Sequence, residues 1–433
     1  MTKKTVFFFA LILMSTSLNA QSTWTLRMAI DTALQNNLGI RIAKNESIIA
    51  HNASTAAAAG MLPRVDVSAA TSEARNEIRQ EFRTGEVLSR SGVEATNTQV
   101  SAELSWTLFD GFRMFATREK LKILEDLGEL NVRVQMLDVM AQTAKSYFDL
   151  QRQQLLVRFT ENGLALYEER VRIAKKKLEI GSAPKTEFLQ AAVDYNAQLT
   201  ILTSRETALS TAQVVLNGLL MRSVIDSIVV EDSLSVKDAP SYEYFLSKIE
   251  SGNLSMKEQM FMKRIAEKQL DEVRSGYYPL LDLNAGYNYS KSETSQGFFL
   301  ENRNMGPSAG LRFNWNLFNG NTLRTDVRNA KIITENSRLA ADQVKQDVQV
   351  ALRTSWLNYS AALSVYNREI ESNSLAKENL TITGERFRLG ESTVLELKEA
   401  QRTYEDAQSR LAGAYYEVRI ALIQIMQLIG EFY

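Results

Sequence analysis

The chain of 433 residues contains no cysteine, a single histidine and five prolines. Without cysteine it can form no disulfide and carry no lipid anchor on a thiol. The histidine, His51, lies in a helical pattern beside Asn52, where a surface position is favoured over a catalytic or metal-binding one. The sequence also lacks a phosphate-binding glycine loop, an HExxH motif and a nucleophile elbow. We therefore expect a protein that is not an enzyme and has no cofactor or metal site.

The few prolines all lie between segments of periodic hydrophobicity, at Pro63, Pro184, Pro240, Pro279 and Pro307. Proline removes a backbone hydrogen bond and clashes with the preceding helical turn, so long helices exclude it. This placement predicts long uninterrupted helices between these positions.

A large charge excess of either sign is missing as well, because 50 Lys and Arg residues face 51 Asp and Glu residues. Proteins that bind nucleic acid usually carry a basic excess, so we expect no nucleic-acid partner. After residue 20 the sequence has no run of 18 or more apolar residues. We therefore predict no transmembrane helix.

The first 20 residues, MTKKTVFFFALILMSTSLNA, combine a basic start, a short apolar run and a small-residue end. This order is typical of a secretory signal peptide, and the apolar run is too short to span a membrane. Removal of residues 1–20 would take away Lys3 and Lys4 and change the net charge from −1 to −3.

The most regular pattern in the chain lies near its end, between Glu385 and Gly430. Bulky and small residues alternate there with a 3-4-3-4 spacing, which predicts knobs-into-holes packing of long helices. The positions are Leu397, Ala400, Tyr404, Ala407, Leu411, Ala414, Val418, Ala421, Ile425 and Leu428. Their counterparts 209 positions earlier are Phe188, Ala191, Tyr195, Gln198, Leu202, Arg205, Leu209, Ala212, Leu216 and Leu219.

A break precedes each of these seams, and the two breaks match. They read LEIGSAPKTE and FRLGESTVLE, with Gly181 and Gly390 in register. Such self-similarity indicates an internal duplication whose long helices turn at two glycine tips. The predicted parts are a first repeat at 21–221, a linker at 222–240 and a second repeat at 241–433.

Each repeat begins with a helical pattern that gives way to alternation of period two. The first helix is expected from Trp24 to about Gly60, and a polar loop is expected at 79–98. Four strands of about ten residues follow from the alternation. They are expected at 65–69, 100–108, 281–290 and 308–317.

The joint after the second strand reads WTLFDG and recurs 209 positions later as WNLFNG. Asp110 is expected to cap the following helix, with Gly111 as a flexible joint. That helix should run from about Phe112 to about Ile180, roughly 70 residues or about 100 Å, before a return helix at 185–221. No compact soluble domain needs a helix of this length.

The four strands predict a membrane β-barrel. Export, a strand length that suits a tilted outer-membrane strand, and aromatic residues at the strand ends all favour it. The aromatic residues are Trp106, Phe109, Tyr287, Tyr289, Trp315 and Phe318. Alternation and aromatic residues alone would also fit a soluble sheet over a packed core.

Four strands cannot close a barrel, and lipid does not tolerate an open sheet edge. Copies of the chain must therefore associate, giving eight strands from two chains or twelve from three. Side chains fill an eight-stranded barrel, so an open duct favours three or more copies.

The doubled plan, the paired LF(D/N)G joints and the two glycine tips resemble TolC-type outer-membrane efflux proteins over Trp24 to Gly430. The resemblance implies a homotrimer with a twelve-stranded membrane β-barrel plus a long α-helical coiled-coil barrel in the periplasm. Outer-membrane lipid would surround the strands. It also implies docking onto a periplasmic adaptor protein coupled to an inner-membrane pump of RND or ABC type, for tripartite efflux or type I secretion.

Docking is expected at the two tips. The tip residues are Gly181, Ser182, Ala183, Gly390, Glu391, Ser392 and Thr393. The simpler explanation of each glycine is an ordinary helix C-cap. Some relatives carry an arginine where Ser392 stands, which leaves open the residues that lock a closed state.

Glu396 and Glu399 are expected on one side of the helix just past the second tip. The first repeat has Glu187 and Gln190 at these places, so the acidic pair belongs to the second repeat alone. The resemblance puts such a pair into the narrow periplasmic mouth as a pore gate, where three copies would form two rings of carboxylates. On the residues alone, an ordinary solvated helix face is the simpler interpretation.

Two other functions fit parts of the pattern. A periplasmic coiled-coil adaptor shares the helical hairpin, but it usually has one hairpin and globular β-domains. A coiled-coil scaffold would not need four alternating strands. Only a duct requires extraction from the outer membrane with detergent.

Overall fold

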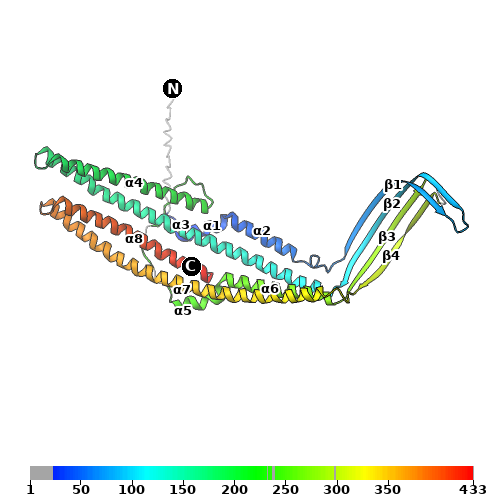
Figure 1. The fold of residues 1–433 in the computed structure, drawn as a ribbon. Coiled ribbons are helices and arrows are strands. Elements are labelled where there is room, and N and C mark those ends of the chain that lie inside the picture. Colours follow the sequence, from blue (N-terminus) through cyan, green and yellow to red (C-terminus); the bar gives the residue numbers. More distant parts are fainter. Residues whose placement is uncertain (1–22, 232, 237–238, 297–298, 433) are drawn as a thin grey trace, which may run out of the picture. The chain divides into compact units, whose positions relative to one another are not determined.

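The computed structural model describes residues 23–231, 233–236, 239–296 and 299–432. The expected signal peptide lies outside these residues. The chain divides into two compact units, and each draws on both halves of the sequence (Figure 1). The helical unit comprises Met1–Leu38, Met136–Leu246 and Leu352–Tyr433, and the sheet unit comprises Gly39–Gln135 and Ser247–Ala351. Among the described helices, none is long and apolar enough to cross a membrane.

Four antiparallel strands form one sheet in the order of the sequence. They are β1 (Arg64–Glu81), β2 (Val87–Phe109), β3 (Leu280–Thr294) and β4 (Glu301–Asn314). β1 and β4 are therefore the two edges, and almost every residue of both is exposed. No packed core covers either face of these strands, as the soluble-sheet interpretation would require.

The strands differ from the predicted ones in length. The polar loop expected at 79–98 is wrong: β1 and β2 continue through it, and only residues 82–86 form the turn. Strand propensity depends on the pairing partner, so a polar segment can form a strand when it has one. β4 ends at Asn314 and so leaves Trp315 and Leu317, which were expected inside a strand, beyond it.

The first predicted helix is two helices, α1 (Leu26–Asn36) and α2 (Leu38–Ala53). The chain becomes extended at Asn37, with φ −62° and ψ 125°. Asn253 adopts nearly the same angles before α6 (Leu254–Arg274), where its side chain accepts a hydrogen bond from the Met256 N–H. The Asn-Leu pairs were visible in the sequence, and their role as helix breaks was not predicted.

In the sheet unit, α6 packs on the first part of α3 (Arg113–Glu179). Ile123, Leu127 and Leu130 of α3 bury their side chains against Ile265. These positions repeat every three to four residues, as one face of a helix requires. The predicted start and end of this long helix are confirmed within two residues.

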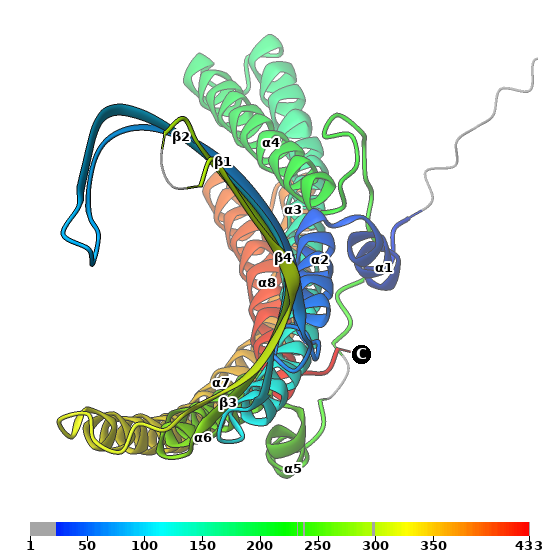
Figure 2. The same ribbon diagram turned by 90° about the vertical axis from the view of Figure 1, so that its right-hand side faces the viewer.

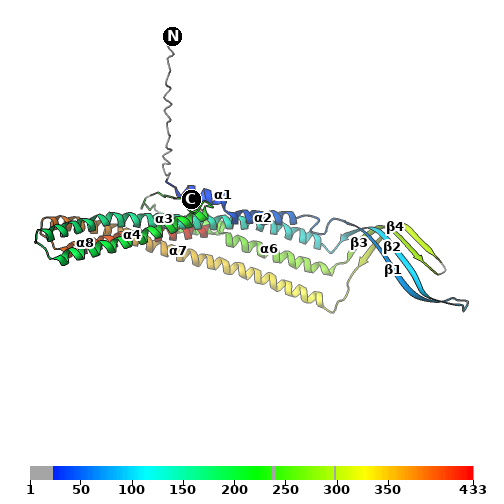
Figure 3. The same cartoon turned by 90° about the horizontal axis from the view of Figure 1, so that it is seen from above.

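In the helical unit, the second half of α3 lies alongside α4 (Lys185–Leu219). The second half of α7 (Thr322–Arg388) likewise lies alongside α8 (Val394–Ile429), as Figure 3 also shows. The α8 seam is confirmed: of its ten residues only Tyr404 and Leu428 are less than fully buried. A short helix, α5 (Tyr242–Gly252), precedes α6 and places Phe245 against Trp356 of α7.

The segment between the two halves is held against the helices by buried amide side chains. Gln151 donates to the carbonyls of Glu231 and Ser233, and its own oxygen accepts from the Tyr415 hydroxyl at 3.0 Å. Val230 forms a bridge with Trp24. One buried glutamine thus joins α3, α8 and this segment.

The predicted cap at the joint between β2 and α3 is confirmed. The Asp110 carboxylate accepts from the Met114 N–H at 2.9 Å, and Gly111 has a φ of +71°. Gly320, its counterpart before α7, has a φ of +68°. A Cβ on Gly111 would overlap the Ser275 carbonyl and lie 2.8 Å from Cβ of Tyr278, whereas a Cβ on Gly320 would meet nothing within 4 Å.

We expect Gly111→Ala to destabilise the protein far more than Gly320→Ala. Both substitutions carry the cost of a positive φ, about 1–2 kcal/mol. Only Gly111→Ala adds a clash with fixed backbone, so its total cost should exceed about 3 kcal/mol. Thermal unfolding of the detergent-solubilised variants measures the difference in stability between them. Equal melting temperatures would contradict the close packing assigned to Gly111.

Candidate functional site: the two helix tips and a buried ion network

Both long helices end at the tips in the same hydrogen-bonded turn. Gly181 and Gly390 have φ of +73° and +77°, and each lies two residues after the last residue of its helix. In each tip the N–H of the residue after the glycine donates to the carbonyl five residues earlier, which is a Schellman motif. The donor and acceptor pairs are Ser182 to Lys177 and Glu391 to Arg386, each at 2.8 Å.

The second tip is closed by a capping box at the start of α8. The Thr393 hydroxyl accepts from the Glu396 N–H at 3.2 Å, and the Glu396 carboxylate accepts from the Thr393 N–H at 2.9 Å. The Ser392 hydroxyl also donates to Glu396, at 2.6 Å. The Thr-x-x-Glu spacing is a known sequence signal for this cap, and sequence analysis missed it.

The capping hydrogen bonds stabilise the ionised form of Glu396. The Ser392 hydroxyl makes the largest contribution, followed by the Thr393 N–H, and together they lower the pKa of the Glu396 carboxyl. Glu396 is therefore a charged residue at neutral pH that is held against the tip. Glu399 lies one turn further along, and both side chains are exposed beside buried Leu397 and Ala400.

The first tip has no such cap, because Pro184 at its N-cap makes no side-chain hydrogen bond. Instead, Lys177 of α3 contacts the start of α4. Its ammonium lies 3.8 Å from the Glu187 carboxylate and 5.2 Å from the centre of the Phe387 ring. Phe387 belongs to α7, so this lysine connects the two tips. A cavity of about 120 Å³ lies beside it, lined by residues of both tips that include Glu187 and Val394.

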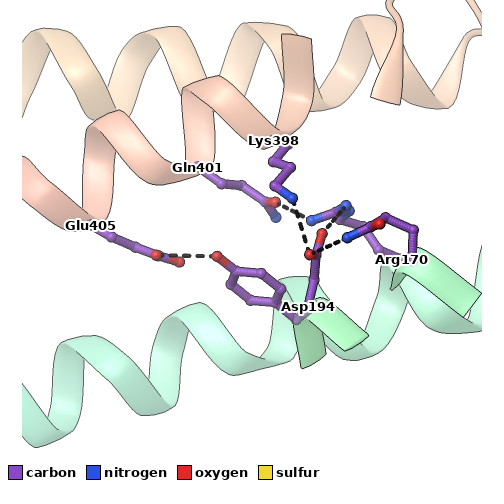
Figure 4. A network of polar contacts seen from close by, with 7 residues as sticks. Arg170, Asp194, Lys398, Gln401 and Glu405 are labelled. Atoms are coloured by element: carbon purple, nitrogen blue, oxygen red, sulfur yellow. Dashed lines mark hydrogen bonds and ion pairs between the residues drawn. The ribbon is translucent and has the colours of Figure 1, made fainter. Parts of the chain in front are cut away.

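Behind the tips, three helices meet at one buried carboxylate, that of Asp194 on α4 (Figure 4). Arg170 of α3 donates to it at 3.1 Å, and Lys398 of α8 donates at 3.0 Å. Gln190 adds a third hydrogen bond from one turn earlier on α4, at 2.9 Å. The Arg170 and Asp194 side chains are 6% and 10% exposed, so solvent hardly screens this ion pair.

The network continues along α8. Arg170 also donates to the Gln401 amide oxygen at 3.1 Å, and the Tyr167 hydroxyl donates to the Glu405 carboxylate at 3.2 Å. Burial alone would raise the pKa of Asp194, but the hydrogen bonds from Lys398, Gln190 and Arg170 outweigh it and lower the pKa. Glu405 has no cation so close, and burial raises its pKa.

This network was not predicted from the sequence. The Asp194 side chain at its centre is only 10% exposed. A signal was present: Lys398, Gln401 and Glu405 form a polar stripe one residue behind the α8 seam.

His51 lies at the surface, as expected, with 71% of its side chain exposed. Its Nδ1 is 2.8 Å from the carboxylate of Glu125, a second buried acid in the sheet unit. Hydrogen bonds from Ser54, His51 and Lys122 lower the pKa of Glu125 to about 2. This carboxylate is therefore fully paired, and it ties the end of α2 to α3.

These groups are arranged for holding helices in place. The described residues contain no cluster of three or more side chains able to bind a metal ion. Arg170 of α3 and Asp194 of α4 form a buried ion pair, and Lys398 of α8, whose side chain is 45% exposed, joins it, which fixes the positions of these helices next to the tips.

Fold and site together define a protein class. Long helical hairpins that continue into an open four-stranded antiparallel sheet are the architecture of outer-membrane channel proteins. The chain belongs to the outer membrane efflux protein family, whose model matches residues 29–220 and 245–431. The resemblance inferred from the tips and the internal repeat is thereby confirmed, and the family is one of channels, not of enzymes.

Individual relatives agree with this assignment. The outer membrane protein TolC of Escherichia coli is 21% identical over 355 residues, covering 78% of this chain and 71% of the relative. The outer membrane efflux protein BepC of Brucella suis is 23% identical, covering 78% and 73%. The CmeC outer membrane channel of Campylobacter jejuni has the same fold, with a TM-score of 0.78 at 17% identity over 94% of this chain and 85% of that one.

We expect Asp194→Asn to destabilise the helical unit by about 3 kcal/mol, because it leaves buried Arg170 without its carboxylate. Glu399→Gln, on the exposed face of α8, is the matched control and should change stability by less than about 0.5 kcal/mol. Denaturant unfolding followed by the helical circular dichroism signal compares the two variants.

The pH dependence has a defined sign. Folding lowers the pKa of Asp194. The contribution of its carboxylate to the free energy of unfolding is therefore complete above the ordinary aspartate pKa of about 3.9 and declines as the pH falls further. The stability gap between the native protein and Asp194→Asn should therefore narrow in acid. A gap that stays constant from neutral pH to about pH 3 would contradict the assigned role.

Proposed function

We propose that this protein is the outer-membrane exit duct of a tripartite efflux or type I secretion system. Three copies close a twelve-stranded barrel, and their helices form a coiled-coil tunnel in the periplasm. Solutes pass from an inner-membrane pump of RND or ABC type through this duct to the exterior. Family membership supports the efflux role, and the trimer rests on the argument from the sheet.

The observation that carries the proposal is the sheet with two free edges and two uncovered faces. β1 and β4 pair on one side only, and a strand edge in lipid leaves backbone hydrogen bonds unmade. Apolar residues such as Val67 and Phe313 are 76% and 64% exposed, which suits contact with lipid. Pairing of β1 with β4 of another copy completes both edges at once.

The two tips form the docking surface for a periplasmic adaptor protein. Gly181 and Gly390 have no atom of the chain within 4 Å of where a Cβ would stand, so a partner can approach the backbone there. The contact from Lys177 to Phe387 holds both tips as one surface. In this arrangement residues 222–240 lie in the equatorial region between the repeats at 21–221 and 241–433.

A periplasmic adaptor or a coiled-coil scaffold has less support. Either would use the helical hairpins and the seam of α8. Neither explains four strands of 14 to 23 residues. Neither explains why the two edge strands, β1 and β4, are exposed on both faces. The duct accounts for both parts of the chain.

The first test of the proposal combines assembly with export. The native protein extracted in detergent should have the mass of three chains, and a stable monomer would exclude the barrel. Tryptophan at both Gly181 and Gly390 should abolish export and leave that mass unchanged, because the bulk lies on the docking surface.

Asparagine at the same two positions is the matched control, since it tolerates a positive φ without large bulk. The asparagine variant should export normally. Export that survives both tryptophans would place adaptor docking elsewhere on the protein.

The pore gate is the acidic pair Glu396 and Glu399. Three copies give two rings of carboxylates, which attract cations in a narrow mouth where the field is poorly screened. In planar bilayers the channel should prefer cations and be blocked by divalent cations added on the periplasmic side. Changing both residues to Gln should remove both properties and leave the trimer intact.

Glu385→Gln provides a control for this experiment, because Glu385 is exposed and pairs with Arg388 at the end of α7, before the second tip. Its conductance and selectivity should equal those of the native channel. A doubly substituted channel that keeps its cation preference and its block would show that other residues form the filter.

A further inference from the structure

The hairpin between β1 and β2 extends well beyond the sheet. The last pair that β2 shares with β3 is Ala95 with Thr294, whereas β1 and β2 stay paired out to Glu81 and Val87. Offsets of 216 and 209 residues between the halves show that the first repeat is seven residues longer here. The added length is part of a two-stranded ribbon, residues 78–90, whereas the described pairing of β3 with β4 ends at Glu293 and Glu301.

A β-bulge separates this ribbon from the sheet. Pairing shifts between Asn76 and Ile78, so that Ser91 and Gly92 together oppose Glu77. Gly92 has a φ of +73°, and a Cβ there would lie 3.3 Å from the Arg75 guanidinium. Bulges of this kind bend a strand pair and increase its twist.

The bend is held by contacts on both sides of β2. Val93, directly after the bulge, is completely buried in a hairpin whose other residues are mostly exposed. Ser295, which follows β3, accepts from the Glu94 N–H at 2.9 Å and donates its own N–H to the Glu94 carbonyl at 2.8 Å. The ribbon thus leaves the sheet at a fixed point.

Figure 2 shows where the ribbon goes. The four strands form an arc, and the hairpin of β1 and β2 turns toward the concave side of that arc. Its turn is closed by hydrogen bonds between Phe82 and Glu86 and from Gly85 to Phe82, with Gly85 at φ +85°. A closed barrel has its lumen on the concave side of its sheet.

From this geometry we propose that the ribbon at residues 78–90 is a lid over the outer mouth of the duct, which limits the size of what passes. The proposal rests on the trimeric barrel of the proposed function. Twelve strands about 4.8 Å apart and tilted by about 40° enclose a radius of about 12 Å. The ribbon reaches about 17 Å from the bulge, so three copies meet near the axis.

The test uses the absence of native cysteine. Ser68→Cys places one thiol on the polar face of β1, below the lid, and its reaction with maleimides is followed from outside on intact cells. With the ribbon present, a small maleimide should react readily and a polyethylene-glycol maleimide of about 5 kDa slowly. Replacing residues 78–90 by Asn-Gly should accelerate the large reagent at least fivefold and leave the small one unchanged.

A control thiol at Thr84→Cys, on the ribbon turn, should react with both reagents at similar rates in the native background. The Thr84→Cys variant also allows a second measurement, disulfide cross-linking between chains, in a protein that keeps residues 78–90. If three turns meet near the axis, oxidation should join chains in pairs, which non-reducing electrophoresis detects.

The lid proposal would be overturned if the large reagent reacts with the Ser68→Cys thiol at equal rates with and without the ribbon. If the variant with Asn-Gly in place of residues 78–90 fails to assemble, the absence of a Thr84→Cys cross-link would overturn it. A failure of the duct itself looks different. In that case the large reagent reacts on cells with neither the Ser68→Cys thiol nor the Thr84→Cys thiol, because both lie inside the outer membrane.

Discussion

Backbone hydrogen bonding at the sheet edges is the constraint on which the rest of this structure depends. One chain supplies four strands, and its sheet ends on both sides in strands whose outer N–H and C=O groups lack partners within the sheet. Water can satisfy such groups and lipid cannot. In the duct proposed above, other copies of the chain would complete the sheet and bring together the helices that follow the strands. The tunnel would then follow from the closure of the barrel.

The helices are subject to a different constraint. Each long helix must pack against its return helix in one defined register. The apolar seam of α8 supplies most of the burial, but a seam that repeats every seven residues is compatible with sliding by one repeat. The buried pair of Arg170 and Asp194, with Lys398 from the third helix, has one arrangement in which all charges are satisfied. Buried ion pairs add little net stability, and their best-attested use is to select one register. Their position directly behind the tips suits that use.

The two repeats differ at their tips and hairpins. Among the described residues, the second tip alone has a capping box and a pair of acids, and the pairing of β1 with β2 extends beyond the sheet. The tips keep the same Schellman turn in both repeats, because the glycine conformation is required wherever a long helix reverses there. Differences thus lie in loops and helix starts, which can change without disturbing the seam or the sheet.

The sequence by itself determined the periodic features. The heptad seam, the duplication, the turns at Gly181 and Gly390 and the cap at Asp110 follow from local spacing and backbone chemistry, which a single segment contains. Tertiary structure decided the rest. The segment at 79–98 became strand because β1 and β2 pair with each other, and Asp194 became buried because α3 and α8 bring cations to it from 24 and 204 residues away. The direction of the ribbon depends on a bulge and on Ser295 beyond β3. Such contacts join residues far apart in the chain, so no local pattern records them.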